Sequence, residues 1–147
     1  RLILPSAKIV DVRRNPMAAC FSGFKQLFAE GQEFSYDLED LAAYYRHYLA
    51  IVRHFHAAAP GAVHTLVYED LVEDTEGEVR RLLAALGLPF DPACLRFFEN
   101  DRAVRTVSSE QVRQPIYRGG IDQWRKFEPF LQPLAEGLGE AREGWRA

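Results

Sequence analysis

The chain has 147 residues, of which 48% are hydrophobic and 27% charged, so one ordinary domain with a sizeable core is expected. Its net charge of −3, with 18 basic against 21 acidic residues, excludes binding to duplex nucleic acid through bulk positive charge. No apolar run approaches the roughly 18 residues of a membrane span, and the start lacks a signal-peptide pattern. We therefore expect a cytoplasmic protein with neither a nucleic acid nor a membrane as partner.

The two cysteines, Cys20 and Cys94, are far apart and have no Cys or His neighbours at the spacing of metal ligands. This pattern predicts neither a disulfide nor a zinc site, and we expect both thiols to be buried. The chain begins with Arg1 instead of Met and reaches a strand-like run within a few residues. We expect it to be a piece of a longer protein.

The first half of the chain has the pattern of a strand, two helices and a second strand. Residues 7–12 form a short β-branched run, and Pro16 then takes the first position of a helix. Apolar residues at spacings of three and four predict that this helix runs from about 16 to 30. Apolar positions within residues 41–55 predict a second amphipathic helix that ends near Pro60 and Gly61, and residues 63–68 have the length and branching of a strand.

The second half has shorter helical patterns and one long irregular segment. Thr75 and a glutamate three residues later fit a capping box, which predicts a short helix that stops at Gly87. A fourth helix is predicted over residues 91–99, with Cys94 facing inward. Residues 100–120 have no periodicity, and a loop of this length in a compact domain is usually functional or disordered. A last helical stretch is predicted after Pro133.

Alternating strands and helices predict a parallel sheet with helices packed on it, in which ligands bind at the carboxyl ends of the strands. Only two strands are clear in the sequence, and a sheet of two parallel strands is a poor core. Further strands are therefore either irregular here or part of a missing segment.

The first candidate site lies at the turn between the first strand and the first helix. Ser22 follows Asn15 by seven positions, so it lies on nearly the same side of the helix, about 10 Å further along its axis. The guanidinium of Arg14 can extend over this side and hold one phosphate together with the Ser22 hydroxyl, and Lys25 can add charge. In the alternative interpretation, Arg13 and Arg14 are solvated surface charges and Ser22 is an ordinary helix serine.

The second candidate site is the turn formed by Arg118, Gly119 and Gly120. Two glycines after an arginine let the backbone approach a ligand closely, and their N–H groups can form an anion-binding nest. Trp124 is predicted to anchor this segment to the core, with the cations at 125–126 nearby. The alternative is a glycine turn that only precedes an amphipathic segment.

Two weaker candidates involve histidines and acidic residues. His47 and His54 share a helix face, but they lack a carboxylate at matching spacing and are predicted to be solvated. Glu69 and Asp70 follow the second strand and could bind a metal at its end. We expect no metal site there.

Together the motifs resemble the sulfotransferase family that uses 3'-phosphoadenosine 5'-phosphosulfate (PAPS), and the bacterial TPR-linked and protein-tyrosine branches in particular. The first turn and helix read AKIVDVRRNPMAACFSGFKQLF, in which Arg14 and Ser22 stand where the family holds the 3'-phosphate. The later run VYEDLVEDTEGEVRRLLAALGLP places Tyr68 where the family contacts the adenine. Residues 108–112 are similar to a nucleotide-covering loop, which implies that Ser108 approaches the sulfuryl group.

The run RGGIDQW resembles the family's RKGxxGDW signature with one residue fewer before the tryptophan. The resemblance implies that Arg118 is a further ligand of the 3'-phosphate and that Gly119, Gly120 and Trp124 belong to the nucleotide site.

The resemblance also implies the fold: an α/β architecture, a three-layer P-loop-NTPase-like parallel sheet flanked by helices, present here only in its C-terminal, helix-rich part. The whole chain, 1–147, is then a single partial domain. Residues 1–99 are its strand and helix portion with the 3'-phosphate site, residues 100–126 are the nucleotide-covering loop, and residues 127–147 are the C-terminal segment.

The function implied is transfer of a sulfuryl group from PAPS to a hydroxyl or amine of a small molecule, carbohydrate or peptide. The family's PKSGTTW-like loop and its catalytic His or Glu do not occur in this chain, so the fragment alone is expected to be inactive and to associate with the missing N-terminal segment or as a homo-oligomer. The alternative is a non-catalytic nucleotide-binding or protein-interaction module. A kinase-like P-loop protein is disfavoured, because the Arg and Ser pair indicates a 3'-phosphate.

Overall fold

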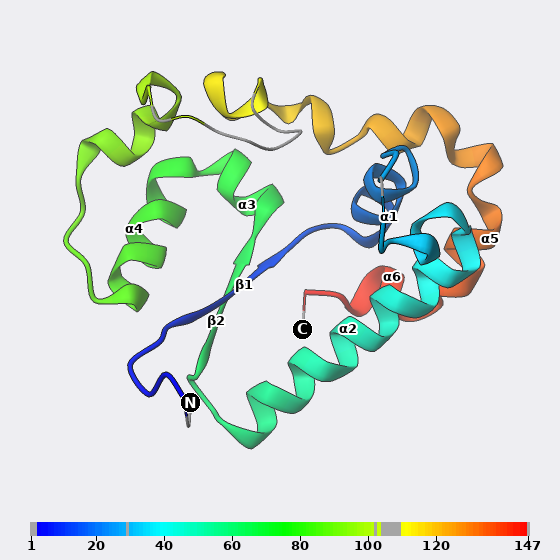
Figure 1. Ribbon diagram of the computed structural model, residues 1–147, viewed down its shortest axis with the longest axis horizontal. Coiled ribbons are helices and arrows are strands. Elements are labelled where there is room, and N and C mark those ends of the chain that lie inside the picture. The colour runs from blue at the N-terminus through cyan, green and yellow to red at the C-terminus, as the bar shows by residue number, and fades with distance from the viewer. Residues whose placement is uncertain (1–2, 29, 102, 104–109, 147) are drawn as a thin grey trace.

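The computed structural model describes residues 3–28, 30–101, 103 and 110–146. Two strands, β1 (Ile9–Arg13) and β2 (Val63–Val67), pair in parallel, with Ile9 opposite Val63 and Arg13 opposite Val67. They form a two-stranded sheet in the part of the chain that the structure describes. Figure 1 shows α4 on one side of this pair and α2 with α6 on the other. The two predicted strands and their parallel pairing are confirmed.

The helix α1 (Pro16–Phe24) is shorter than the stretch 16–30 that the periodicity predicts. Its start is as expected, because the Asn15 side chain accepts a hydrogen bond from the Ala18 amide at 3.2 Å. Beyond Phe24 the chain turns away from the helix axis. The Tyr36 hydroxyl donates to the carbonyl oxygen of Phe28 at 2.6 Å and accepts from its amide at 3.1 Å. These two bonds hold the backbone of Phe28 outside the helix, which explains the early end.

The long helix α2 (Leu38–Ala58) follows a 3₁₀ turn, η1 (Glu33–Tyr36). It begins at Leu38, three residues before the predicted start at Leu41, and ends at Ala58, close to the predicted stop at Pro60 and Gly61. Its N-terminus is set by Asp37, whose carboxylate accepts hydrogen bonds from the amides of Glu39 and Asp40 at 2.8 and 3.0 Å. Leu38, the first residue of the helix, already packs against the core, so the apolar side begins at the start of α2.

Two helices follow β2, namely α3 (Tyr68–Glu73) and α4 (Thr75–Leu86). The predicted capping box is wrong, because the N-cap is Asp74, which accepts from the Gly77 amide at 3.0 Å. The Thr75 hydroxyl instead donates to the Leu71 carbonyl at 2.8 Å and joins α4 to α3. Gly87 ends α4 with a φ of +73°, which is the left-handed cap expected there.

Residues 92–99 form a 3₁₀ segment, η2 (Pro92–Glu99), where a continuous helix is predicted. Arg96 interrupts it with a φ of −113° and a ψ of 36°. In a 3₁₀ segment residues three apart share a face, so Leu95 and Phe98 are partly buried while Cys94 is exposed, and the predicted burial of Cys94 is wrong. Cys20 is buried as expected, and burial raises the pKa of its thiol to about 12.

The rest of the described chain is a series of short helical elements. Within the predicted loop the structure has η3 (Gln111–Arg113) and η4 (Arg118–Gly120), followed by η5 (Gln123–Phe130). The helical stretch expected after Pro133 is present as α5 (Gln132–Leu138), and α6 (Ala141–Gly144) follows it. No helix among the described residues is long and apolar enough to cross a membrane.

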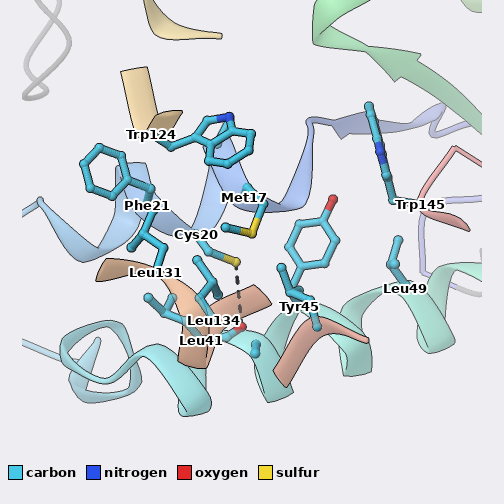
Figure 2. Close-up of a cluster of buried hydrophobic side chains, with 13 residues drawn as sticks. Met17, Cys20, Phe21, Leu41, Tyr45, Leu49, Trp124, Leu131, Leu134 and Trp145 are labelled. Atoms are coloured by element: carbon cyan, nitrogen blue, oxygen red, sulfur yellow. Dashed lines mark hydrogen bonds between the residues drawn. The ribbon is translucent and has the colours of Figure 1, made fainter. Parts of the chain in front are cut away.

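The apolar core lies beside the sheet, where α1 and α2 meet the C-terminal elements (Figure 2). Its larger members are the apolar side chains of α1, α2, α5 and the segments around them: Met17, Cys20, Phe21, Leu41, Tyr45, Leu49, Trp124, Leu131, Leu134, Leu138 and Trp145. By contrast, Ile9 and Val12 of β1 remain 47% and 64% exposed. These two residues point to opposite faces of the sheet, so both faces of β1 are partly uncovered.

Candidate functional site

A cavity of about 320 Å³ lies at the carboxyl ends of β1 and β2, where the topology predicts a ligand site. Its wall comes from the β1–α1 turn and α1, from the start of α3, and from the segments around η2 to η5. One side of the cavity carries the cations and the hydroxyl, and the other side carries aromatic rings. The lining residues that matter for its chemistry are Arg14, Ser22, Lys25, Tyr68, Phe97, Tyr117, Gly120 and Gln123.

The two adjacent arginines at the end of β1 have different surroundings. Arg13 is 2% exposed, and its guanidinium contacts the Asp11 carboxylate at 3.0 Å and donates to the Trp145 carbonyl at 2.5 Å. It therefore joins β1 to the C-terminal segment. Arg14, one residue later, lines the cavity. The sequence alone leaves open whether either arginine is a solvated surface charge, and neither is one in the structure.

Arg14 contacts both the glycine turn and the aromatic side of the cavity. Its Nη2 donates a hydrogen bond to the carbonyl oxygen of Gly120, and its guanidinium carbon lies 5.1 Å from the centre of the Tyr68 ring. Its Nε is buried and has no hydrogen-bond partner among the described residues. An unpaired buried donor costs free energy, so this atom favours a ligand that supplies an acceptor oxygen.

Ser22, in the last turn of α1, and Lys25, directly after the helix, are exposed on the cavity side. The Lys25 ammonium donates to Oε1 of Gln123 at 2.5 Å and lies 5.2 Å from the centre of the Phe21 ring. No described residue forms a hydrogen bond with the Ser22 hydroxyl. The geometry thus leaves a hydroxyl and two cations on one side of the cavity, as a site for a phosphate requires.

The other side of the cavity is aromatic. Tyr68 begins α3 directly after β2, and Phe97 and Tyr117 come from irregular segments. Burial raises the pKa of the Tyr68 hydroxyl, and the nearby Arg14 charge opposes this rise, so the phenol is protonated at neutral pH. Flat apolar surfaces of this kind suit a planar base. The sequence gives no signal for Phe97 or Tyr117, because neither stands in a predicted apolar stripe or a motif. Gln123 lies within the RGGIDQW run, but the sequence assigns it no role.

The second candidate turn reaches the cavity only in part. Gly120 lines it, and a Cβ at this position would lie 3.3 Å from Arg14 Nη2, so a glycine lets the backbone approach the guanidinium. Arg118 and Gly119 are exposed and do not line the cavity in this structure. Trp124 is buried in the core, as expected for an anchor of this segment. Ser108 lies outside the described residues, so its predicted approach to the sulfuryl group has no structural account here.

The weaker candidates do not form a site in the described residues. His47 and His54 are exposed on α2. The described part of the chain has no group of three or more His, Cys, Asp or Glu side chains placed to hold a metal ion. Glu69 instead accepts a hydrogen bond from the Asn15 amide, and Asp70 pairs with Arg146.

Two comparisons with known proteins found a match. Residues 1–92 match the model of the sulfotransferase family, and this range includes Arg14, Ser22, Lys25 and Tyr68. An uncharacterized protein of Aquifex aeolicus (strain VF5) is 34% identical over 142 residues, which are 95% of this chain and 19% of that protein. The chain therefore spans about a fifth of the length of this relative. Because the family model matches residues 1–92, more than half of the chain, the chain belongs to the sulfotransferase family.

Proposed function

We propose that this chain binds the 3'-phosphoadenosine part of PAPS and is the C-terminal portion of a sulfotransferase domain. In this proposal Arg14, Ser22 and Lys25 hold the 3'-phosphate and Tyr68 contacts the adenine. The observation that carries it is the buried, unpartnered Nε of Arg14 at the end of β1, beside the Ser22 hydroxyl and the Lys25 ammonium.

The cavity fits this ligand in its charge, its shape and its place in the fold. Its cationic side is formed by Arg14 and Lys25, which now donate to the neutral oxygens of Gly120 and Gln123. A phosphate would give these two donors negatively charged oxygens as acceptors. Charge-assisted hydrogen bonds are roughly twice as strong as neutral ones. The aromatic side accepts a base, and the volume of about 320 Å³ is within the range of small-molecule sites.

The role of these residues in catalysis would be binding and orientation. When bound, PAPS supplies the sulfuryl group: a bond forms between the acceptor oxygen or nitrogen and sulfur, while the bond from sulfur to the 5'-phosphate oxygen breaks. That oxygen keeps the electron pair, and the acceptor loses its proton to a base. The residues of this chain hold the far end of the nucleotide, so they contribute ground-state binding and alignment more than bond breaking. Ser108 stays a proposed contact of the sulfuryl end, and Arg118 a proposed further ligand of the 3'-phosphate.

The acceptor in this proposal is a hydroxyl or amine of a small molecule, carbohydrate or peptide, and the complete protein works in the cytoplasm without a metal. The chain alone binds nucleotide but does not transfer sulfuryl groups. A non-catalytic nucleotide-binding module is the second candidate, because the phosphate site does not by itself contain the chemistry. The reading frame of the complete gene separates the two, since a PKSGT-like segment upstream supports the enzyme.

The binding proposal is tested by calorimetry with adenosine 3',5'-bisphosphate and, separately, adenosine 3'-monophosphate and 5'-monophosphate. We expect the two 3'-phosphates to bind and the 5'-monophosphate to bind more weakly. Arg14→Ala should weaken binding of the bisphosphate more than tenfold, because a charged hydrogen-bonded contact is worth about 1.5 to 3 kcal/mol.

Arg142→Ala is the matched control, because this exposed arginine pairs with Glu128 at 3.9 Å and does not line the cavity. It should leave the affinity unchanged. Equal affinity of the wild-type chain and Arg14→Ala for the bisphosphate would remove the central assignment.

A further inference from the structure

The peptide bond between Arg14 and Asn15 is held at both of its polar ends by side chains from two other elements. The Tyr45 hydroxyl of α2 donates to the Arg14 carbonyl oxygen at 2.6 Å. The Asn15 amide donates to Oε1 of Glu69, in the first turn of α3, at 3.0 Å. A trans peptide is planar, and its C=O and N–H point in opposite directions. The two contacts therefore fix the orientation of one rigid unit, and with it the direction in which the Arg14 side chain leaves the backbone.

Regular secondary structure does not provide these two contacts. The paired residues of the sheet end at Arg13 and Val67, and α1 begins at Pro16. The N-cap of α1 is already made by the Asn15 side chain, which accepts from the Ala18 amide. The peptide after Arg14 thus lies between a strand and a helix, and Tyr45 and Glu69 supply the partners that neither element gives it.

We propose that Tyr45 and Glu69 are positioning residues of the nucleotide site, which act by fixing the Arg14–Asn15 peptide so that the Arg14 guanidinium lies in the cavity over Tyr68. This inference rests on the proposed function, because it concerns the same site. Neither residue lines the cavity. Their effect on the nucleotide passes through Arg14.

The chemistry of both side chains suits this role. Burial raises the pKa of Tyr45 far above neutral, so its hydroxyl stays a donor throughout the working range of pH. Its ring is part of the core, which keeps the hydroxyl in place. Glu69 follows Tyr68 directly, so the segment that presents the ring to Arg14 also holds the backbone of Arg14. Two consecutive residues of α3 therefore place Arg14: Glu69 binds the backbone after it, and the Tyr68 ring lies 5.1 Å from its guanidinium carbon.

The test is a double-mutant cycle on affinity for adenosine 3',5'-bisphosphate, measured by calorimetry. We expect Tyr45→Phe and Glu69→Ala each to weaken binding about fivefold, the effect of one hydrogen bond of about 1 kcal/mol. Glu69→Gln keeps an acceptor oxygen and should stay within about twofold of the wild type. When Arg14 is already alanine, Tyr45→Phe and Glu69→Ala should have no further effect, because the residue through which they act is gone.

Two variants serve as matched controls. Tyr36→Phe removes a hydroxyl that also donates to a carbonyl at 2.6 Å, that of Phe28, away from the cavity. Asp70→Ala removes the acid next to Glu69, which pairs with Arg146 at 2.8 Å instead of the turn. Both should keep the wild-type affinity. If Glu69→Ala does not fold, as judged by circular dichroism, the cycle of Tyr45→Phe with Arg14→Ala still tests the proposal.

Hydrogen exchange of the Asn15 amide in the free protein gives a readout that needs no nucleotide. We expect slow exchange in the wild type and in Glu69→Gln, and faster exchange in Glu69→Ala. Unchanged exchange in Glu69→Ala, or effects on affinity that persist without Arg14, would overturn the positioning proposal while the nucleotide site stands. A wild-type chain that does not bind the bisphosphate would instead overturn the proposed function, and the exchange data would still decide whether Glu69 holds the peptide.

Discussion

Arg14 donates a hydrogen bond to the carbonyl oxygen of Gly120, which joins the residue after β1 to a glycine turn 106 positions later. Lys25 makes a parallel contact with Gln123 in the same segment. Both cations that we propose for phosphate binding therefore also hold residues 120–123 against α1. A phosphate in the cavity would compete with these two neutral oxygens for the same donors.

Lys25→Met tests the contribution of this second cation. The substitution keeps an apolar stem of similar length and removes the charge, so we expect the affinity for adenosine 3',5'-bisphosphate to fall about fivefold, as for an exposed ion pair of about 1 kcal/mol. The loss should shrink at high salt, because salt screens exposed charges. Calorimetry at two salt concentrations measures both effects. Lys126→Met is the control, because this lysine does not line the cavity. It should change neither the affinity for the bisphosphate nor the dependence of that affinity on salt.

Arg13 should matter for stability and not for the nucleotide contact itself. Its side chain is 2% exposed and that of its partner Asp11 is 8% exposed, so Arg13→Met leaves a buried carboxylate without its cation. We expect a loss of about 3 to 5 kcal/mol in the free energy of unfolding, as for other broken buried pairs. Urea unfolding followed by circular dichroism measures it. The double variant Asp11→Leu with Arg13→Met should recover much of the loss, and a single variant as stable as the wild type would contradict the structural role of the pair.

The two cysteines should differ strongly in reactivity. Cys94 is exposed and Cys20 is buried against the Leu41 carbonyl, so a thiol reagent should modify Cys94 in the folded protein and Cys20 only after unfolding. Mass spectrometry of the labelled chain, before and after adding urea, identifies the modified residue. Equal labelling of both in the folded state would show that α1 and α2 do not enclose Cys20.

Burial of Cys20 also makes stability depend on pH in the alkaline range. Its pKa rises from 9.0 to about 12 on folding, so the folded state holds its proton more tightly than the unfolded state does. The stabilisation is full below pH 9 and is lost as the pH rises from 9 toward 12. Between pH 8 and 10 the unfolding free energy should fall by about 1.4 kcal/mol through this thiol, the equivalent of one pKa unit. Cys20→Ala should show a smaller fall than the wild type in urea unfolding at the two pH values.

The exposed side chains of β1 should make the isolated chain associate. Val12 is 64% exposed, and an uncovered apolar strand offers both side chains and free backbone groups to a second chain. Analytical ultracentrifugation over a range of concentrations should detect oligomers, and Val12→Lys should shift the chain toward the monomer. A wild-type chain that is monomeric at every concentration would contradict this expectation.

The sequence predicts local features of the fold well where one short signal decides them. The start of α1 at Asn15 and Pro16, the stop of α4 at Gly87 and the two parallel strands follow from such signals. The end of α1 does not, because it depends on the contact between Phe28 and Tyr36. The spacing of an α-helix places Cys94 on the same side as Leu95 and Phe98, but the segment is a 3₁₀ helix, in which Cys94 lies on another side.

The residues of the candidate site likewise fall into a group that the sequence predicts and a group that it does not. Arg14, Ser22 and Lys25 stand at helical spacings in one short stretch, so the sequence can place them on one side of α1, and all three line the cavity. Phe97, Tyr117 and Gln123 reach the same cavity from irregular segments whose path is set by packing, which no periodicity encodes. Whether these residues bind a nucleotide stays a prediction.

The composition of the core has a consequence for how the chain folds during synthesis. The helices α1 and α2 pack against each other and against α5, whose core residue Leu134 lies 85 positions after Leu49. At roughly 5 to 20 residues per second, the apolar sides of α1 and α2 wait for several seconds after they leave the ribosome. During that interval the nascent chain presents two partly uncovered helices, and chaperone binding to this stretch should end once α5 has emerged.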